Sequence, residues 1–397
     1  MVKAYTLRLR RMYHTLLVVC ILGVTVSAQC PGKCSCSPAG VRCRGLRLTV
    51  VIPTDYVNIS ITNSNLKSLD NTSFGRNIEH FIISESIITS IAPSAFTGLV
   101  NVRSITFYST TITAIKPCSF SSIRHSASIS FELANIADIE RGAFSNLKGL
   151  QQLTFKGSHI ETIHSDAFFD FDVQRFLLDD TEIPTLETGA FNGKVEVNEL
   201  NFTGVSFTTI KSQAFIGFSR ISRSVITSCR FEILYCNPLP YLYQATQAAK
   251  GTFSLSNSSF VCDCFTVPLM NFINVNSIYI PSSVLCVLPP TGSRVPFNAT
   301  SVSDACPQKL DLNCGKKVRT PMTLQCGGEV LIPATTNPNT VHVIDDVTTN
   351  SGRTYTEPHQ GSFSGGQNQN SSAYRSSSLV MPLKLCTSAV FIVMLFY

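Results

Sequence analysis

Cysteine is the residue whose number and spacing in this 397-residue chain point most directly to chemistry. Fifteen cysteines are present, and eight of them form two clusters: Cys30, Cys34, Cys36 and Cys43, then Cys262, Cys264, Cys286 and Cys306. In an oxidising compartment such thiols form disulfides, whereas in the cytosol they more often bind a metal or take part in catalysis. The compartment therefore decides between these chemistries.

The N-terminus indicates export. Residues 1–14 are basic, residues 16–26 are apolar, and Val26-Ser27-Ala28 offers small residues to a signal peptidase. Because the apolar run is too short to span a bilayer, we expect residues 1–28 to be a cleaved signal peptide rather than an uncleaved anchor. The cysteines then form a disulfide framework, and we expect no metal site.

The C-terminal region favours a lipid anchor. Residues 333–378, rich in Thr, Asn, Ser, Gly and Gln, predict a disordered stalk. The tail at 379–397 ends in an uninterrupted apolar run of thirteen residues, and a membrane span needs ~20. The small residues Asn370, Ser371 and Ser372 match a GPI-attachment site, with 376–378 as a rival. The alternatives are a short membrane span and a tail on a plainly secreted protein.

Charge and motifs argue against nucleic-acid binding and catalysis. Of the 31 basic residues, four lie in the signal peptide and two beyond residue 372. The remaining 25 basic residues balance 25 acidic ones, so the chain between the two ends has no net charge to attract a polyanion. The metalloprotease, P-loop, nucleophile-elbow and dinucleotide motifs are absent from the sequence. We expect no enzyme activity and no cofactor. Asp179, Asp180 and Glu182 form an acidic spot that either binds a cation or is a solvated edge.

The elements that must position these residues repeat about every 24 residues. Phenylalanine marks seven copies, at Phe74, Phe96, Phe120, Phe144, Phe168, Phe191 and Phe215. Two apolar residues spaced by one, such as Leu153 and Phe155, predict a short strand with one buried face. One copy cannot bury that face alone, so the copies must stack, with parallel strands on one side and the Phe column on the other.

This pattern, L-x-x-L-x-L-x-x-(S/T)-x-I-x-x-I-x-x-x-x-F, resembles the leucine-rich repeat of extracellular proteins, and the two cysteine clusters resemble its caps. The resemblance implies an α/β-type solenoid: a horseshoe of about eight to nine repeats, with parallel strands on the concave face and disulfide caps at both ends. It implies the pairs Cys262–Cys286 and Cys264–Cys306. The family usually has Asn at the ninth position, where this chain has Ser64, Ser86, Thr110, Ala134, Ser158, Thr181, Val205 and Cys229. The C-terminal cap lacks the usual Trp, so we expect Phe265, Leu269 and Phe272 to form its centre.

The predicted order of segments follows. It is a signal peptide at 1–28, an N-terminal cap at 29–55, repeats at 56–260, a C-terminal cap at 261–306, a small disulfide extension at 307–332, the stalk and the tail. Without Cys20 and Cys386, we expect Cys229 to pair with Cys236 and Cys314 with Cys326. Cys118 is then left over, since it lies about 20 Å along the stack from Cys229. It is either a tolerated free thiol or the link of a disulfide-bonded dimer.

The strand positions that alternate with buried ones are the candidate ligand-binding residues on the concave face. They are His80, Ile82, Ser84, Ser104, Thr106, Tyr108, Ser128, Ser130, Glu132, Gln152, Thr154, Lys156, Arg175, Leu177 and Asp179, and the next coil adds Glu199, Asn201 and Thr203. Short polar side chains suit a protein surface or a glycan better than a polyanion. The alternative is that binding occurs on an edge or a convex loop.

Six glycosylation sequons occur, at Asn58, Asn71, Asn201, Asn257, Asn298 and Asn370. We expect glycans on Asn58 and Asn201 to restrict binding to the coils from His80 to Asp179. The resemblance implies an extracellular recognition or adhesion protein without a signalling domain, held at the membrane by the expected anchor. The alternative is a secreted, non-catalytic accessory subunit that stabilises a secreted enzyme.

Overall fold

The computed structural model describes residues 30–306, apart from 49–50, 53–55, 76, 100–101, 124–126, 237 and 290. It also describes the backbone of four short strands further on: β26 (Lys317–Val318), β27 (Leu324–Cys326), β28 (Glu329–Leu331) and β29 (Val343–Ile344). The predicted signal peptide, the anchor site at Asn370, Ser371 and Ser372, and the tail lie outside the described residues, as does nearly all of the stalk.

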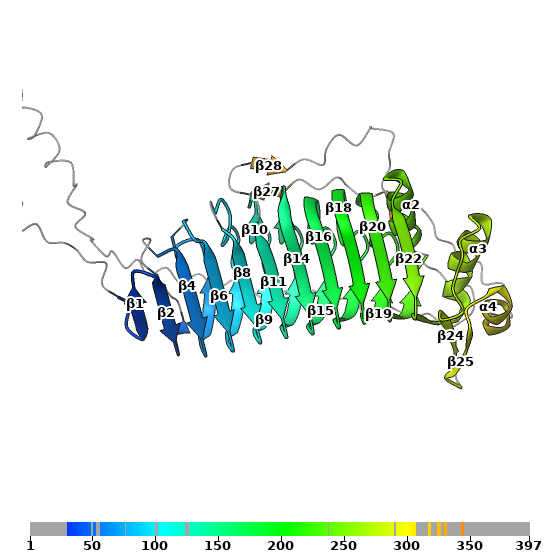
Figure 1. The fold of residues 1–397 in the computed structure, drawn as a ribbon, viewed down its shortest axis with the longest axis horizontal. Coiled ribbons are helices and arrows are strands. Elements are labelled where there is room, and N and C mark those ends of the chain that lie inside the picture. The colour runs from blue at the N-terminus through cyan, green and yellow to red at the C-terminus, as the bar shows by residue number, and fades with distance from the viewer. Residues whose placement is uncertain are drawn as a thin grey trace, which may run out of the picture. The chain divides into compact units, whose positions relative to one another are not determined.

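The first apolar pair of each repeat forms one strand of a long sheet, which we call sheet A (Figure 1). After the antiparallel hairpin of β1 (Cys34–Ser37) and β2 (Gly40–Arg44), the strands run parallel. They are β4 (Asn58–Thr62), β6 (His80–Ser84), β8 (Ser104–Tyr108), β11 (Ser128–Glu132), β14 (Leu150–Lys156), β16 (Phe168–Asp179), β18 (Phe191–Thr203), β20 (Phe218–Thr227) and β22 (Thr252–Ser256). These nine coils confirm the predicted solenoid of eight to nine repeats.

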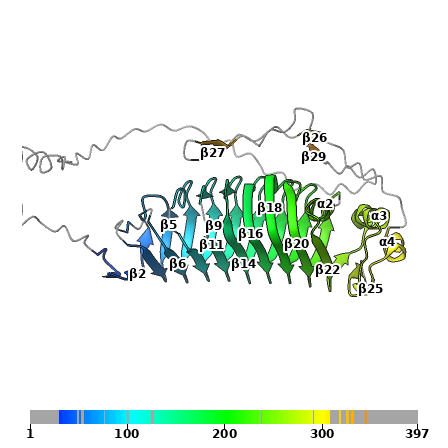
Figure 2. The same ribbon diagram turned by 45° about the horizontal axis from the view of Figure 1, so that its top comes forward.

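The later apolar residues of each repeat form a second sheet, sheet B, which the sequence pattern did not predict as strands (Figure 2). Its strands are β3 (Arg47–Leu48), β5 (Asn65–Leu69), β7 (Ile87–Ile91), β9 (Thr111–Ile115), β12 (Asn135–Ile139), β15 (His159–Ile163), β17 (Glu182–Leu186), β19 (Ser206–Ile210), β21 (Arg230–Leu234), β23 (Ser259–Val261), β24 (Leu285–Leu288) and β25 (Ser293–Pro296). The isoleucines of these strands are three positions apart, and both are buried, so the strict alternation that marks a strand is lost.

The phenylalanine column is buried in the coil interior, as the stacking argument predicted, but a second sheet rather than the column alone forms the wall opposite sheet A. Phe96, Phe120, Phe144 and Phe168 stack ring on ring, with centroids 4.9, 4.9 and 5.0 Å apart along the series. These separations match the ~4.8 Å spacing of paired strands, so each coil presents its ring to the next one. A second series, Phe107, Phe131 and Phe155, meets the first edge-on. Two short strands, β10 (Phe120–Ser121) and β13 (Phe144–Ser145), continue the pairing around the coil.

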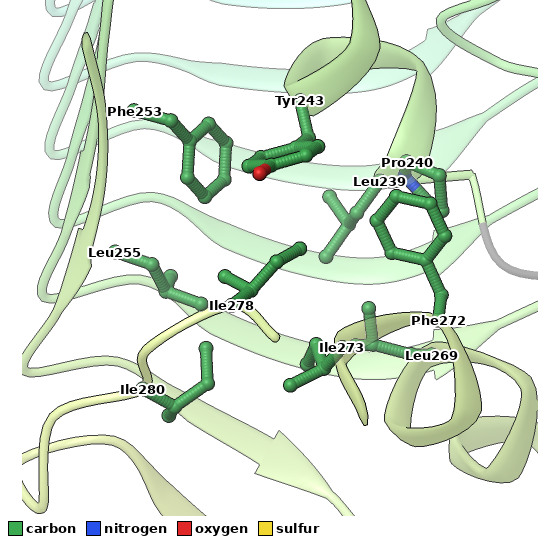
Figure 3. Close-up of a pocket in the computed structure, with 10 residues that line it drawn as sticks. All are labelled: Leu239, Pro240, Tyr243, Phe253, Leu255, Leu269, Phe272, Ile273, Ile278 and Ile280. Carbon is green, nitrogen blue, oxygen red and sulfur yellow. The ribbon is translucent and has the colours of Figure 1, made fainter. Parts of the chain in front are cut away.

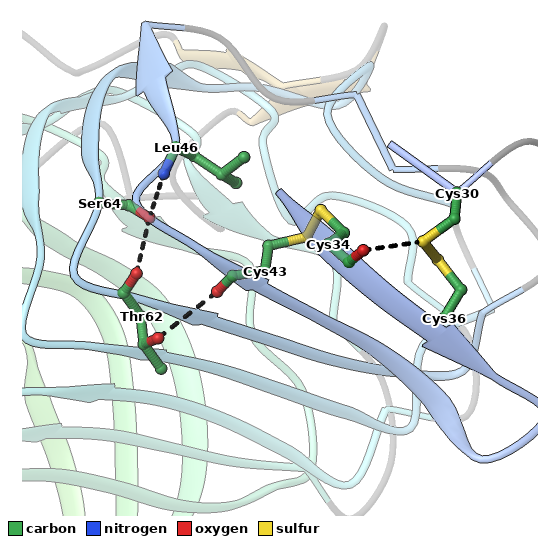
Figure 4. The surroundings of a disulfide bond; sticks show 7 residues. All are labelled: Cys30, Cys34, Cys36, Cys43, Leu46, Thr62 and Ser64. Atoms are coloured by element: carbon green, nitrogen blue, oxygen red, sulfur yellow. Dashed lines mark hydrogen bonds between the residues drawn. A yellow bond between two sulfur atoms is a disulfide. The ribbon is translucent and has the colours of Figure 1, made fainter. Parts of the chain in front are cut away.

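The serine hydroxyls at the ninth repeat position bond to backbone groups in the coil interior. The Ser158 hydroxyl accepts a hydrogen bond from the Ala134 backbone N–H at 3.1 Å and can donate to the carbonyl of Phe131 at 3.2 Å or of Lys156 at 3.1 Å. Ser64 accepts from the Leu46 N–H in the same way and donates to the Thr62 carbonyl, the equivalent of the Lys156 carbonyl (Figure 4). A hydroxyl therefore replaces the amide wherever this column holds serine.

Disulfides close both ends of the stack. In the N-terminal cap, Cys30 pairs with Cys36 and Cys34 with Cys43 (Figure 4). In the C-terminal cap, the pairs Cys262–Cys286 and Cys264–Cys306 are those that the family resemblance implied, and they are confirmed. Each cap covers core that an end coil would otherwise expose to water.

The C-terminal cap is built from α2 (Pro240–Ala248), the 3-10 turn η1 (Cys264–Thr266), α3 (Val267–Val275) and α4 (Ala299–Ala305). The prediction for its centre is right only for Leu269, which is buried together with Met270 and Ile273. Phe265 and Phe272 are half-buried and pack edge-on against Tyr235 and Tyr243 instead. An apolar cavity between α2, β22 and α3 is lined by Tyr243, Phe253, Leu255, Phe272 and their neighbours (Figure 3).

The predicted pair Cys229–Cys236 is wrong. Cys229 is a buried free thiol at the ninth repeat position, where it faces the coil interior and lies 3.3 Å from the Phe202 carbonyl. Cys118 and Cys236 are both in disulfides, so the prediction that Cys118 is the leftover thiol is also wrong. Both alternatives offered for Cys118, a free thiol and the link of a disulfide-bonded dimer, assumed that no other cysteine of the chain pairs with it. Cys314 and the side chain of Cys326 lie outside the described residues.

Candidate binding face

The outward side chains of sheet A form three columns, which we call the binding face. The strand register aligns His80 with Ser104, Ser128, Gln152 and Arg175 in the first column. It aligns Ile82, Thr106, Ser130, Thr154 and Leu177 in the second, and Ser84, Tyr108, Glu132, Lys156 and Asp179 in the third. The structure thus brings the fifteen predicted residues onto one surface.

Many polar groups on this face bond to one another. His80 Nδ1 lies 2.8 Å from the Ser104 hydroxyl, and the Ser130 hydroxyl donates to Glu132 at 2.7 Å. Thr154 is only 8% exposed, and its hydroxyl accepts from the Gln152 amide. A ligand would have to compete with these internal hydrogen bonds for the groups that make them.

Apolar side chains give the N-terminal half of the face a different character. Ile82 is 40% exposed and Tyr108 is 42% exposed, on the adjacent strands β6 and β8. Leu133 is 55% exposed and directly follows Glu132, the residue aligned with Tyr108. These three residues form what we call the apolar patch.

Sequence reasoning missed Leu133. It occupies the corner after β11 with φ of +51°, where other coils place Asn63, Glu85 and Ser109. Polar residues and glycine tolerate this backbone region better than leucine does. In the next coil that corner is Gly157, whose Cβ, if it had one, would lie 2.8 Å from Leu133 Cδ2. An apolar residue in an otherwise polar corner column was the available signal.

The C-terminal half of the face carries alternating charges. Arg175 aligns with Glu199, which aligns with Arg223 on the following strand. Beside this column, Lys156 and Asp179 form an ion pair at 3.4 Å. Opposite charges on neighbouring strands stabilise the sheet modestly, and three basic residues against two acidic ones leave little net charge to attract a polyanion.

The sequons on this face differ in accessibility. The Asn58 side-chain amide donates to the Ala39 carbonyl at 2.7 Å, so the nitrogen that would carry a glycan holds the N-terminal hairpin instead. Asn201 uses only its side-chain oxygen, which accepts from the Thr203 hydroxyl. Asn71, Asn257 and Asn298 are exposed, and Asn370 lies outside the described residues.

One cluster of ionisable groups outside the binding face is held together by ion pairs. His164 bridges three coils, with Nε2 2.9 Å from Asp138 and Nδ1 3.4 Å from Glu187. The hydrogen bond to Glu187 raises the pKa of His164 to about 9, although burial acts against the charge. Burial would raise the pKa of Glu187, but the hydrogen bond from His164 lowers it to about 2.

The acidic spot at the end of β16 is also partly neutralised. Asp179 pairs with Lys156, and His159 Nδ1 lies 3.1 Å from Glu182. Within the described residues, no group of three or more His, Cys, Asp or Glu side chains is arranged to hold a metal ion. No helix of the described residues is long and apolar enough to cross a membrane.

Comparison with known protein families identifies the repeats. The family model of the BspA-type leucine-rich repeat region matches this chain in six copies, over residues 54–170 and 113–235. The chain is similar to the crystal structure of human 5T4 (Wnt-activated inhibitory factor 1, trophoblast glycoprotein), at 16% identity and a TM-score of 0.36, over 68% of this chain and 95% of that one. No curated protein matches. With its repeated coils and its disulfides at both ends, this chain is a leucine-rich repeat protein with cysteine-rich caps.

Proposed function

We propose that this chain is an extracellular recognition or adhesion protein that binds a protein ligand through the N-terminal half of sheet A. The apolar patch of Ile82, Tyr108 and Leu133 is the observation that supports it. Exposed aromatic and aliphatic side chains next to hydroxyl-bearing residues are typical of the centre of a protein interface. A glycan ligand is less well supported, because the observation that distinguishes this part of the face is its exposed apolar side chains.

The proposal includes a lipid anchor and no catalytic role. Leucine-rich repeat scaffolds typically bind rather than catalyse, and the chemistry in the described residues is structural: disulfides, ion pairs and one buried thiol. An anchored solenoid would act as an adhesive surface or a co-receptor. The small residues at Asn370, Ser371 and Ser372, followed by a short apolar tail, support the anchor.

Two measurements test the proposal. Phosphatidylinositol-specific phospholipase should release the protein from expressing cells; retention would reject the anchor, and release without treatment would favour the secreted accessory subunit. The released protein, screened against an array of extracellular domains, should show binding that Tyr108→Ala weakens at least tenfold. Thr113→Ala is the matched control, since Thr113 is an exposed residue of the same coil on sheet B. Equal binding by both variants would reject the apolar patch as the ligand site.

A further inference from the structure

Two disulfide-bonded cysteines occupy the same corner of the solenoid, five coils apart. Cys118 follows the last residue of β9 by three positions, and Cys236 follows the last residue of β21 by two. Both have positive φ, 59° and 49°, so each lies in the turn that leaves sheet B. Cys118 is only 4% exposed.

These two cysteines cannot be bonded to each other. Five strand steps separate β9 from β21 in sheet B. At ~4.8 Å a step, the two turns lie about 24 Å apart, whereas the Cα atoms of a disulfide lie within about 7 Å. Each must therefore be bonded to a different cysteine of the chain.

Elimination leaves few partners. Eight cysteines are used in the two caps, and Cys229 is free. The others are Cys20, Cys314, Cys326 and Cys386. Cys20 falls in the expected signal peptide and Cys386 in the apolar tail, so Cys314 and Cys326 are the partners that a mature, exported chain offers.

Chain length favours one of the two possible pairings. Cys306 is fixed to Cys264, and the preceding helix α4 packs on β24. From β24 to β9 is seven strand steps, or about 34 Å. The eight residues from Cys306 to Cys314 span at most about 29 Å, and a disulfide adds at most about 7 Å between Cα atoms. Cys314 would therefore reach the turn of Cys118 only as a fully extended chain, whereas the turn of Cys236, beyond β21, is two strand steps or about 10 Å from β24. The twelve residues from Cys314 to Cys326 then have to cover only about 24 Å.

We propose that Cys236 is bonded to Cys314 and Cys118 to Cys326, so that two disulfides link the solenoid to the chain that follows the C-terminal cap. This replaces the small loop expected from a Cys314–Cys326 bond. Each bond forms when two thiols give up two protons and two electrons to a disulfide of the oxidising compartment, which is reduced to a dithiol.

Peptide mapping of the unreduced, secreted protein tests the assignment. Trypsin separates the four cysteines onto four peptides, 104–124, 231–250, 310–316 and 320–353, because Lys116 is followed by proline and is not cut. Mass spectrometry should find 231–250 joined to 310–316 and 104–124 joined to 320–353. A link between 310–316 and 320–353 would overturn the proposal, as would a disulfide-linked dimer through 104–124.

Single variants give a second measurement. In Cys118→Ser, a maleimide should label Cys326 and leave Cys314 unlabelled, whereas in Cys236→Ser the labelling should be the reverse. If Cys314 and Cys326 were bonded to each other, neither variant would expose a thiol on 310–316 or 320–353. Should a variant fail to fold and be secreted, the peptide map of the unmodified protein still decides. Phospholipase release is independent of these results, so failure of the anchor and failure of the cross-links can be distinguished.

Discussion

The hydroxyl of Ser158 offers a sharp test of how the coil interior is stabilised. Ser158→Ala removes the acceptor of the Ala134 N–H and the donor to the Phe131 carbonyl, both in the buried interior. Alanine fits the space, so packing should change little. The expected loss comes from a buried N–H left without a partner, which costs about 1–3 kcal/mol.

The neighbouring coil supplies the opposite experiment. Ser64 N–H donates to Ser86, and Ala134 N–H donates to Ser158, so each hydroxyl serves the N–H of the coil before it. Ala134→Ser would place a hydroxyl where it can accept from the Thr110 N–H. We expect this substitution to raise the free energy of unfolding by about 0.5–1.5 kcal/mol.

Urea unfolding followed by circular dichroism measures both changes, provided that the slope of free energy against urea stays constant. Hydrogen exchange of the Ala134 amide gives a local measurement, since that amide should lose protection in Ser158→Ala. The reasoning is refuted if the unfolding free energy of Ser158→Ala lies within about 0.3 kcal/mol of that of the unmodified protein, which is roughly the error of such comparisons, and the Ala134 amide keeps its protection.

Two further predictions concern ionisable groups. Because the pKa of His164 is raised on folding, protonated His164 contributes fully to the free energy of unfolding below its unfolded pKa of ~6.5, and this contribution is lost as pH rises towards 9. Because the pKa of Glu187 is lowered on folding, the contribution of ionised Glu187 is lost as pH falls from ~4.5 towards 2. His164→Gln should therefore flatten the fall in stability between pH 6.5 and 9, measured by melting across that range, and an unchanged profile would contradict the ion-pair assignment. Burial raises the pKa of the Cys229 thiol to about 12, so the thiol should resist labelling in the native protein and react once the unreduced chain is denatured. Cys229→Ser should abolish that reaction while keeping the fold, because a hydroxyl can donate to the same Phe202 carbonyl; a remaining reactive thiol would show that another cysteine is unpaired.

Sequence reasoning succeeded wherever one coil repeats the next. The Phe column, the strands of sheet A and the positions of the fifteen face residues all follow from a period of about 24 residues, because stacked coils place equivalent residues at equivalent points. The cap disulfides Cys262–Cys286 and Cys264–Cys306 followed from the family resemblance. Sheet B was missed as a sheet because its residues do not alternate strictly between apolar and polar.

Sequence reasoning failed where a single residue departs from its column. Cys229 and Cys236 are seven positions apart, which suggests a small loop, yet Cys229 faces inward and Cys236 lies beyond β21. Leu133 was not among the predicted residues of the face, yet it is an exposed apolar side chain in a left-handed corner. Separation along the chain does not predict disulfide pairing or side-chain exposure at such positions, because the geometry of the coil sets the direction of each side chain.

The sequence by itself therefore determined the architecture: a capped solenoid whose core and outward face alternate with a fixed period. Only the tertiary structure decided the chemistry of individual side chains, namely which thiol is free, which asparagine amide holds the N-terminal hairpin, and which apolar side chains are exposed. The physical reason is that burial follows the repeating apolar pattern of the sequence itself. The bonding partners and the exposure of a single side chain depend instead on residues of the adjacent coils, which are about 24 residues away in the chain but ~4.8 Å away in space.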